Sequence, residues 1–531
     1  MPILEWLNKG EAVRTAKQVP YRLLQGVESL SYGDSDSENM LIQGDNLEAL
    51  KALLPLYAGK VKCIYIDPPY NTKSAFEHYD DNLEHSKWLS MMYPRLELLW
   101  ELLTPSDGVI MVSINDDEGH YLKVLCDQIF GRTNFISSLV WNYEGNTDNQ
   151  AHIINYHEYI LVYSKSGKIS PPGVVDPNID ESSKLYRDEI RNTVVKNGPK
   201  NPPSKIILPK GFPANIESGE IKTSAIEWPK YTQNLVINNY KLTKDVVANS
   251  GWASKRLLEQ FIENGFRHVL DTKKQKTRFE ITRSGAVEVV KVREKEKGHF
   301  ISVLRGLGTT NQMRILLSKL NIKFTYPKPV KLVSYLIEAF SVDGDIVLDS
   351  FAGSGTTAHA VLDLNSKQLG KRKFVAIEMS SHNAESVIAP RLKHVIDGNI
   401  KAELSGTGGG FHYYRLGPTV FDEYGAIRPD IHFPELAAHI WYLETHAPLT
   451  ECSNSPLLGI HNGTAYYLLY NGILGDRRPQ GGNVLTGPIL AELPAHDGPK
   501  VIYGESSRLG AARLQKENIT FKQIPYDVRT R

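Results

Sequence analysis

The strongest constraint on this chain is a short apolar run that ends abruptly in a rigid polar tetrapeptide. The run is Cys63-Ile64-Tyr65-Ile66, and it leads directly into Asp67-Pro68-Pro69-Tyr70. An apolar run of this length, bounded by turn residues, predicts a short buried β-strand. Asp67 is therefore expected at the carboxyl end of a strand, which is where open α/β sheets place their ligand chemistry.

Taken alone, the tetrapeptide is open to two interpretations. Pro-Pro is a strong turn signal, and Asp before Pro favours the start of a turn, so the four residues could be purely structural. The alternative is a binding site, because an acceptor carboxylate, two rigid prolines and an aromatic face suit an exocyclic amino group on a flat ring. Patterns elsewhere in the chain distinguish between these two interpretations.

A second pattern, of strand, glycine-rich turn and helix, lies about 280 residues downstream. Residues 345–349 predict the strand, residues 350–357 form the turn Ser-Phe-Ala-Gly-Ser-Gly-Thr-Thr, and a helical pattern begins at Ala358. This layout is typical of nucleotide cofactor sites, because glycine lets the backbone approach a ligand closely. No lysine follows the second glycine, so the turn is neither a P-loop nor Gly-x-Gly-x-x-Gly and indicates no phosphate site.

Acidic residues end this strand and the next one. Asp349 suits a ligand that carries an ammonium group. Residues 373–378 predict the following strand, and its last residue, Glu378, is placed where an acid can hydrogen-bond ribose hydroxyls. A nucleoside that carries an amino acid and no phosphate fits both acids. The pattern therefore indicates S-adenosyl-L-methionine as the cofactor.

The charge of the chain is unevenly distributed. The net charge is +1, but residues 161–330 hold 30 Lys+Arg and 16 Asp+Glu, a net of +14, and the remainder has a net of −13. A local surplus of this size is the electrostatic footprint of a nucleic-acid-binding region, although a solvated basic surface is the alternative. Basic clusters in its later part suit phosphate contacts. The candidate DNA-contacting residues are Lys273, Lys274, Lys276, Arg278, Lys291 and Arg293.

Composition excludes several other classes. A chain of 531 residues is long enough for about three domains. No apolar run approaches the ~18 residues of a membrane helix, and the first residues lack a secretory pattern, so we expect a cytoplasmic protein with no membrane partner. Three cysteines, far apart in sequence, argue against a disulfide framework or a zinc cluster, and no metal site is expected.

These motifs resemble those of amino-group DNA methyltransferases of the permuted β class. The chain is most similar to the modification subunits of type III restriction–modification systems and to related stand-alone adenine methyltransferases. In that class the target-site motif precedes the cofactor motif, with the DNA-recognition region between them, and Gln43-Gly44-Asp45-Asn46 precedes the tetrapeptide at the usual distance. The same order occurs here.

The resemblance implies an α/β, Rossmann-like fold with a seven-stranded, mostly parallel and circularly permuted sheet. Strands are expected to end at Asp45, Asp67, Asp349 and Glu378, and those ending at Asp67 and Asp349 should be neighbours. The implied domains are a first part of the methyltransferase core at 1–165, an inserted target-recognition domain at 166–323, a second part of the core at 324–405, and a small C-terminal α/β module at 406–531.

The resemblance also assigns roles residue by residue. Asp67, Pro68, Pro69 and Tyr70 match the catalytic motif, in which the Asp carboxylate and the first Pro carbonyl accept the amino group while the tyrosine ring stacks on a flipped base. Asp45 matches the acid near the cofactor adenine, and Lys328-Pro329 the segment that closes over the methionine moiety. The remaining cofactor residues are Asp349, Phe351, Gly353, Gly355, Thr356 and Glu378.

The implied activity is site-specific methyl transfer to the N6 amino group of adenine in duplex DNA, in a restriction–modification or phage-defence setting. Asp at the first motif position favours adenine, because cytosine-N4 enzymes of the family more often carry Ser there. The alternatives are a cytosine-N4 enzyme, a non-catalytic DNA-recognition subunit, or an amino-group methyltransferase of RNA or protein. Duplex DNA, a second copy of the chain and a separate restriction/helicase subunit are the implied partners.

Two further regions carry weaker signals. His157-Glu158, beside the predicted strand at 159–163, invites a general-base role, but a packing or surface histidine is the favoured interpretation. Beyond Ala402 the chain departs from the core pattern: residues 407–410 look like a linker, and strands are predicted at 465–470 and 500–503 with a helix at 508–517. No nuclease or P-loop motif occurs there, so dimerisation or partner docking is the expected role.

Overall fold

A computed structural model describes most of the chain as two compact units. The described residues are 3–72, 84–143, 155–169, 173–179, 189–292, 300–368, 370–422, 427–447, 449, 455–524 and 528. The first unit comprises residues 1–177 and 299–531, and the second comprises residues 178–298. Among the described helices, none is long and apolar enough to cross a membrane.

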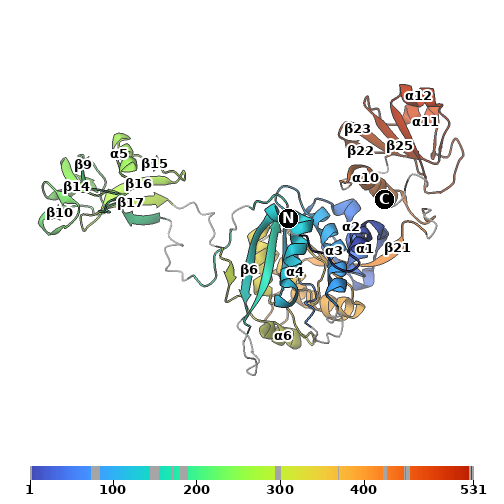
Figure 1. Cartoon of the computed structure of the whole chain (residues 1–531), viewed down its shortest axis with the longest axis horizontal. Coiled ribbons are helices and arrows are strands. Elements are labelled where there is room, and N and C mark those ends of the chain that lie inside the picture. The colour runs from blue at the N-terminus through green and yellow to red at the C-terminus, as the bar shows by residue number, and fades with distance from the viewer. Residues whose placement is uncertain are drawn as a thin grey trace. The chain divides into compact units, whose positions relative to one another are not determined.

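The first unit is built on one mixed sheet of eleven strands within the described residues (Figure 1). The strand order is β1-β21-β3-β20-β19-β4-β5-β7-β6-β18, and β2 also pairs with β21. Neighbours from β21 through β5 are parallel, whereas β7 is antiparallel to both β5 and β6. The strand bounds are β1 Arg22–Gly26, β2 Tyr32–Gly33, β3 Met40–Gln43, β4 Val61–Ile66, β5 Val109–Ile114, β6 Phe135–Asn142, β7 His157–Ser164, β18 Val303–Leu304, β19 Ile346–Asp349, β20 Lys373–Glu378 and β21 Gly410–Thr419.

Helices cover both faces of this sheet, which explains why its central strands are continuously apolar. Successive side chains of a strand point to opposite faces. In β4, Ile64 and Ile66 belong to one buried cluster, with α2, α3 and α4, and Cys63 and Tyr65 belong to another, with α7, α8 and α9. The helices of this unit outside its C-terminal module are α1 Lys9–Gln18, α2 Asn46–Tyr57, α3 His85–Leu102, α4 Asp116–Cys126, α6 Thr310–Lys319, α7 Val330–Phe340, α8 Thr356–Gln368 and α9 Ala389–Asp397.

Seven contiguous strands, β3, β20, β19, β4, β5, β7 and β6, form the core of the sheet. They include the strands predicted to end near Asp45, Asp67, Asp349 and Glu378 and the one predicted at 159–163. The predicted fold class, an α/β fold with a mostly parallel sheet, is therefore confirmed. The sheet is wider than predicted, because β1, β2, β18 and β21 extend it. β21 begins at Gly410, inside the segment expected to be a linker and a separate module, yet it lies parallel to β3 with His412 opposite Met40. The chain thus returns to the main sheet after residue 406.

The second unit is a small, mainly β structure with its own buried cluster. Residues 178–298 lie within the predicted recognition domain and are shorter than it at both ends, since α6 belongs to the first unit. The cluster includes Leu208, Phe212, Phe261 and Phe279. Its elements are β8 Glu189–Thr193, β9 Ser204–Leu208, β10 Gly219–Ile221, β11 Lys230–Tyr231, β12 Leu235–Asn238, β13 Lys241–Leu242, β14 Val246–Ser250, α5 Lys255–Glu263, β15 Val269–Leu270, β16 Lys276–Ile281 and β17 Val287–Val292.

Within the described residues, the C-terminal module consists of a four-stranded sheet, a two-stranded sheet and helices. Its predicted strands at 465–470 and 500–503 correspond to β23 and β25, and the predicted helix at 508–517 corresponds to the shorter α12. Tyr442 on its first helix donates to Glu101 of α3 over 2.7 Å. The bounds are α10 Phe433–Thr445, β22 Leu457–His461, β23 Thr464–Leu468, β24 Val484–Leu485, α11 Gly487–Glu492, β25 Lys500–Gly504, β26 Ser506–Ser507, α12 Ala511–Lys516 and β27 Ile519–Gln523.

Candidate active site

The two motifs that are most distant in sequence meet at the same edge of the main sheet. β4 and β19 are parallel neighbours, with Cys63 opposite Val347 and Ile64 opposite Leu348. Because parallel neighbours end at the same edge, Asp67 and Asp349 both stand at their carboxyl ends. β20 pairs with the other side of β19, and β3 pairs with β20 so that Glu378 lies opposite Gln43. The prediction that the Asp67 and Asp349 strands are neighbours is confirmed.

Four charged or hydroxyl groups meet just beyond β4. The Tyr70 hydroxyl donates to Asp67 Oδ1 over 2.8 Å and lies 3.0 Å from Glu158 Oε2. Lys328 Nζ lies 3.0 Å from the same Asp67 oxygen, 3.0 Å from Glu158 Oε2 and 2.8 Å from the Tyr70 hydroxyl. It also lies 4.7 Å from the centroid of the Tyr70 ring, within cation–π range. Two carboxylates thus share one ammonium and one phenol.

This mutual contact shifts the acidity of both donors. Burial, together with the negative charges of Asp67 and Glu158, raises the pKa of Tyr70 well above its usual value. Burial lowers the pKa of Lys328, but the attraction of the same two carboxylates is stronger and leaves that pKa raised. At neutral pH Tyr70 is therefore a neutral donor and Lys328 a cation.

Backbone and side-chain contacts fix the tetrapeptide on both sides. Trp88 of α3 donates its Nε1–H to the Pro69 carbonyl over 2.8 Å, which leaves the Pro68 carbonyl as the neighbouring acceptor. Asn71 has a left-handed φ of 60° and donates to the fully buried Glu118 of α4 over 2.6 Å. The prolines limit the remaining backbone freedom. The acceptors at Asp67 and Pro68 are therefore held by the packing of α3 and α4.

The glycine turn is organised by Asp349. Its Oδ1 accepts from the Phe351 amide over 2.9 Å and its Oδ2 from the Thr357 hydroxyl over 2.5 Å. The carboxyl is buried, and burial raises its pKa to about 7, against the lowering effect of these two hydrogen bonds. Phe351 itself is buried in the core beneath the turn. Asp349 thus both shapes the turn and remains a titratable acid at the strand end.

Both glycines of the turn are needed for their backbone conformation. Gly353 has φ 54° and Gly355 has φ 78°, in the left-handed region that favours glycine. A Cβ at Gly355 would also lie 2.8 Å from a methyl carbon of Ile388. The Gly353 amide donates to Glu378 Oε2 over 2.8 Å, and the Ser380 amide donates to Glu378 Oε1 over 2.9 Å. Glu378 is fully buried, and its two oxygens accept the hydrogen bonds of these backbone amides.

A buried arginine supports the same turn from behind. Arg391 of α9 donates to the Ser354 carbonyl over 2.7 Å and lies 3.2 Å from the Thr356 hydroxyl. Burial lowers the pKa of Arg391 to about 9. Thr356 in turn donates to the carbonyl of Lys328 over 3.1 Å. Lys328 therefore touches both motifs, the glycine turn through its backbone and Asp67 through its side chain.

Asp45 and Pro329 lie at helix starts near this edge. Asp45 follows β3 and caps α2, because its Oδ1 accepts from the amides of Leu47 and Glu48. Its other oxygen pairs with Arg95 of α3 at 3.2 Å, and a third of its side chain remains exposed. Pro329 is the N-cap of α7 and follows Lys328 directly. Each predicted cofactor residue thus lies at a strand end, in the glycine turn or at a helix start on the same edge of the sheet.

Residues near the turn include buried polar atoms without a hydrogen-bond partner among the described residues. Ser350 Oγ, at the start of the turn, is one, and Asn383 Oδ1, whose amide nitrogen lies 3.4 Å from Glu378, is another. Buried polar atoms normally find partners. Acidic, hydroxyl and amide groups around glycine backbone suit a nucleoside that carries an amino acid, so the residues fit S-adenosyl-L-methionine.

The predicted DNA-contacting residues fall into two groups. Lys273, Lys274 and Lys276 are exposed, and none has an ion-pair partner among the described residues. In contrast, Arg278 is paired with Glu189 at 2.5 Å, and Lys291 with Asp271 at 2.6 Å. Arg293 lies outside the described residues.

Sequence reasoning gave Glu118 and Arg391 no role in the site, and it set Glu158 aside together with His157. Glu158 follows His157, which was considered as a base but lies 3.0 Å from the Tyr159 hydroxyl and contacts no motif residue among the described ones. No motif marks Glu158, and its β7 position only becomes informative once β7 is placed beside β5. An acid in a mostly apolar strand, with the side chain at the carboxyl edge of its neighbours, was the one available signal.

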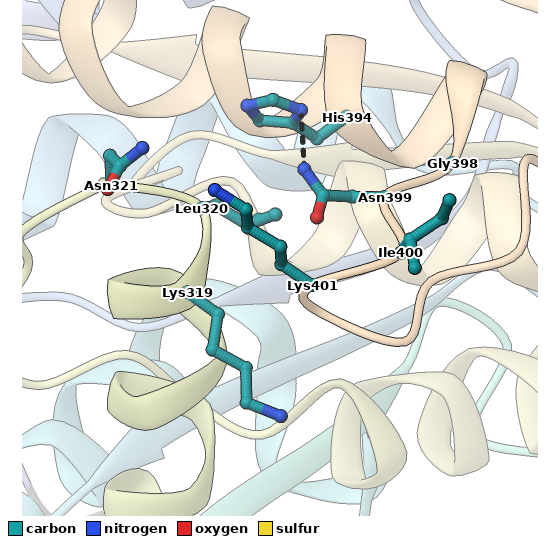
Figure 2. Close-up of a pocket in the computed structure, with 8 residues that line it drawn as sticks. All are labelled: Lys319, Leu320, Asn321, His394, Gly398, Asn399, Ile400 and Lys401. Carbon is teal, nitrogen blue, oxygen red and sulfur yellow. Dashed lines mark hydrogen bonds between the residues drawn. The ribbon is translucent and has the colours of Figure 1, made fainter.

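A surface hollow lies away from both motifs. It has a volume of about 400 Å³ and is open to solvent, and Asn399 lies 3.2 Å from His394 beside it (Figure 2). No group of three His, Cys, Asp or Glu side chains in the described part of the chain is placed to hold a metal ion. The hollow is lined by Lys319, Leu320, Asn321, His394, Gly398, Asn399, Ile400 and Lys401, none of which belongs to either motif.

Comparison with known proteins agrees with the two motifs. The chain is 33% identical over 417 residues to the Mod subunit of the type III restriction–modification enzyme EcoPI from Escherichia phage P1, covering 71% of this chain and 63% of that one. It is 29% identical to the EcoP15I Mod subunit from Escherichia coli, covering 78% and 71%. The chain thus spans about two thirds of the length of these curated relatives.

A solved structure and a family model complete the comparison. The cytosine-N4-specific PvuII DNA methyltransferase has a TM-score of 0.33 and 12% identity, covering 69% of this chain and 89% of that one. The model of a DNA methylase family, named for N6 and N4 methyltransferases, matches residues 61–389, which include both motifs and more than half of the chain. The chain therefore belongs to this DNA methylase family.

Proposed function

We propose that this protein transfers a methyl group from S-adenosyl-L-methionine to the N6 amino group of adenine in duplex DNA. The observation that carries the proposal is the meeting of the two motifs at Lys328, whose carbonyl accepts from Thr356 and whose ammonium contacts Asp67 and Tyr70. A methyl acceptor held at Asp67 and a donor held by the glycine turn would then be adjacent.

The acceptor half of the site suits a flipped base. A base inside a duplex must leave the stack before its amino group can react, at a cost of a few kcal/mol. The Tyr70 ring provides a stacking surface worth about 1–3 kcal/mol. The Asp67 carboxylate and the Pro68 carbonyl can accept both hydrogens of the amino group, which directs the nitrogen lone pair away from the ring. No covalent bond to the enzyme is needed, because orientation and electrostatics lower the barrier.

The cofactor half consists of this chain's acids, glycines and hydroxyls. S-adenosyl-L-methionine supplies an electrophilic methyl group on its sulfonium. Asp349 would attract the ammonium, Asp45 would lie near the adenine, and Gly353 and Gly355 would admit the ligand to the backbone. Phe351, Thr356, Lys328 and Pro329 would shape the methionine pocket. Glu378, which accepts from the Gly353 and Ser380 amides, would also accept from the ribose hydroxyls.

The basic unit supplies the proposed DNA contacts. Residues 178–298 carry 23 Lys+Arg and 15 Asp+Glu. The exposed lysines Lys273, Lys274 and Lys276 suit phosphate contacts, which fix position without reading sequence. We infer duplex DNA as the substrate, and therefore a cytoplasmic enzyme, with a second copy of the chain and a separate restriction subunit as further partners.

A methyl-transfer assay on duplex DNA with labelled S-adenosyl-L-methionine tests the proposal. The product should release N6-methyladenine when the DNA is digested to nucleosides. Release of N4-methylcytosine alone would overturn the adenine assignment and leave the family activity in place. Label that appears only in RNA or protein, or binding of DNA without any transfer, would overturn the proposal as a whole.

A further inference from the structure

Glu158 enters the active site from a strand that carries neither motif. It is the second residue of β7, and Trp141 of β6 lies opposite it. Its Oε2 lies 3.0 Å from the Tyr70 hydroxyl and 3.0 Å from Lys328 Nζ. We propose that Glu158 is a positioning residue for methyl transfer, which draws the Lys328 ammonium away from Asp67 when the target base enters. The proposal rests on the proposed function.

Lys328 occupies the space that the target is expected to need. Its ammonium lies 3.0 Å from Asp67 Oδ1, which is where the amino group of the base should donate. It also lies 4.7 Å from the centroid of the Tyr70 ring, at the hydroxyl end of the ring. An amino group that enters here and the ammonium compete for this side of Asp67. A shift of the lysine toward Glu158 relieves that competition.

Glu158 provides the place to which the ammonium can move. Lys328 is largely enclosed, with only 11% of its side chain exposed, so its charge needs a nearby carboxylate throughout. Glu158 already contacts Nζ, and a small shift toward it would keep that compensation. One carboxylate then serves the lysine and the other serves the base. Without Glu158, the ammonium has Asp67 alone and competes with the target for it.

Glu158 also orients the ring of Tyr70. The hydroxyl contacts both carboxylates, at 2.8 Å to Asp67 and 3.0 Å to Glu158. When Asp67 turns to the base, Glu158 remains as an acceptor for the phenol. The ring is therefore held in place for stacking during the step in which Asp67 changes partners.

The test compares Glu158→Gln with the wild-type protein under saturating S-adenosyl-L-methionine. The amide keeps the size and an acceptor for Tyr70 but removes the charge that attracts Lys328. We expect kcat on duplex DNA to fall about 30-fold, less than the about 10²–10³-fold cost of losing a group that contacts the reacting atoms, because Glu158 acts through Lys328 and Tyr70. The Kd of S-adenosyl-L-methionine should stay within about twofold, and Glu11→Gln, on the exposed face of α1, should match the wild type.

Two readouts separate this role from a merely structural one. Loss of Glu158 should lower the pKa of Lys328, so Glu158→Gln should regain activity as pH rises and the lysine becomes neutral, while the wild type changes less. Adding Lys328→Met to Glu158→Gln should raise kcat above that of the single variant, because the competing ammonium is gone. The groups facing Lys328 come from β4, β6 and β7 and their ends, namely Asp67, Tyr70, Trp141, Tyr143 and Glu158.

The outcomes distinguish this proposal from the proposed function. If the wild-type protein transfers no methyl group to DNA, the proposed function fails first. If the wild type is active and Glu158→Gln has the same kcat and KM for DNA, the role of Glu158 is refuted while the function stands. A loss of activity that neither high pH nor Lys328→Met relieves would also refute it.

Discussion

Asp67, Glu158 and Lys328 form a charged cluster beyond β4, in which side chains of opposite sign are largely enclosed and in contact, whereas the 178–298 unit carries lysines on its surface. Lys328 is 11% exposed and touches two carboxylates, while Lys273, Lys274 and Lys276 are exposed without an ion-pair partner among the described residues. Enclosed charges are suited to orienting a reacting group, because the surrounding dielectric is low. Exposed charges are suited to a mobile, salt-dependent contact with phosphates.

Asp67→Ala should produce the largest effect, and it should disturb only the charged cluster beyond β4. The change removes the acceptor for the target amino group and leaves Lys328 to pair with Glu158, so we expect methyl transfer to fall at least about 10³-fold. Binding of S-adenosyl-L-methionine, measured by calorimetry, should be largely unchanged. Asp36→Ala, on the exposed surface, is the control. Wild-type turnover by Asp67→Ala would rule out the proposed role of Asp67.

Replacing all three exposed lysines, Lys273, Lys274 and Lys276, by Gln should impair DNA binding by the 178–298 unit. Three lost phosphate contacts should weaken DNA binding about 10²-fold near physiological salt and reduce the slope of log K against log[salt] by up to about 3. Titration of labelled duplex at several salt concentrations measures both. The rate of methyl transfer at saturating DNA should be unchanged, because these substitutions leave the charged cluster at Asp67 intact. An unchanged salt slope would exclude these lysines from the DNA interface.

Asp349 tests whether an enclosed acid still titrates near neutrality. Its pKa is raised to about 7, mainly by burial. Above that pH it is a carboxylate that attracts the ammonium of the cofactor, and below it this attraction is lost, so affinity should rise about tenfold between pH 6 and pH 8. Calorimetry across this range measures it.

The same shift has the opposite sign for folding. A carboxyl whose pKa is raised in the folded protein stabilises it most below its usual pKa of about 4, and this contribution disappears as pH rises through about 7.

Asp349→Asn should remove the pH dependence of cofactor binding. Equal pH dependence in wild type and variant would show that another group titrates.

The smallest effect is expected for the two basic residues of the 178–298 unit that are paired with acids, as Lys328 is in the charged cluster. Arg278 and Lys291 are held by Glu189 and Asp271, so Arg278→Gln and Lys291→Gln should leave the salt slope of DNA binding unchanged. Each should lower the free energy of unfolding by about 1 kcal/mol or less, because partly exposed ion pairs contribute little. Chemical denaturation measures the difference. A salt slope lowered by either variant would place that residue on the DNA instead.

Charge counts along the sequence do not distinguish enclosed lysines from exposed ones. The surplus at 161–330 correctly drew attention to the inserted region, but it counted Lys328 together with Lys273. The first is enclosed beside Asp67 and the second is exposed. Sequence does not reveal which acids lie beside which lysines, because Glu189 and Arg278 are 89 residues apart and meet only through the pairing of β8, β17 and β16.

Strands were the most predictable part of the fold. The run at Cys63 to Ile66 is apolar throughout because both of its faces are buried, and the same holds for residues 109–114. β21 was missed as part of the main sheet because its glycine-rich start resembles a linker. Its pairing with β3 depends on where the chain returns, which no local pattern records.

The sequence by itself determined the two motifs, the strands that carry them and the acids and glycines at their ends, because burial on both faces and left-handed turns impose local residue patterns. Only the tertiary structure decided that Lys328 joins the motifs and that Glu158 faces it. The physical reason is that strand order and packing bring together side chains about 90 to 260 residues apart, and no local pattern specifies such a contact.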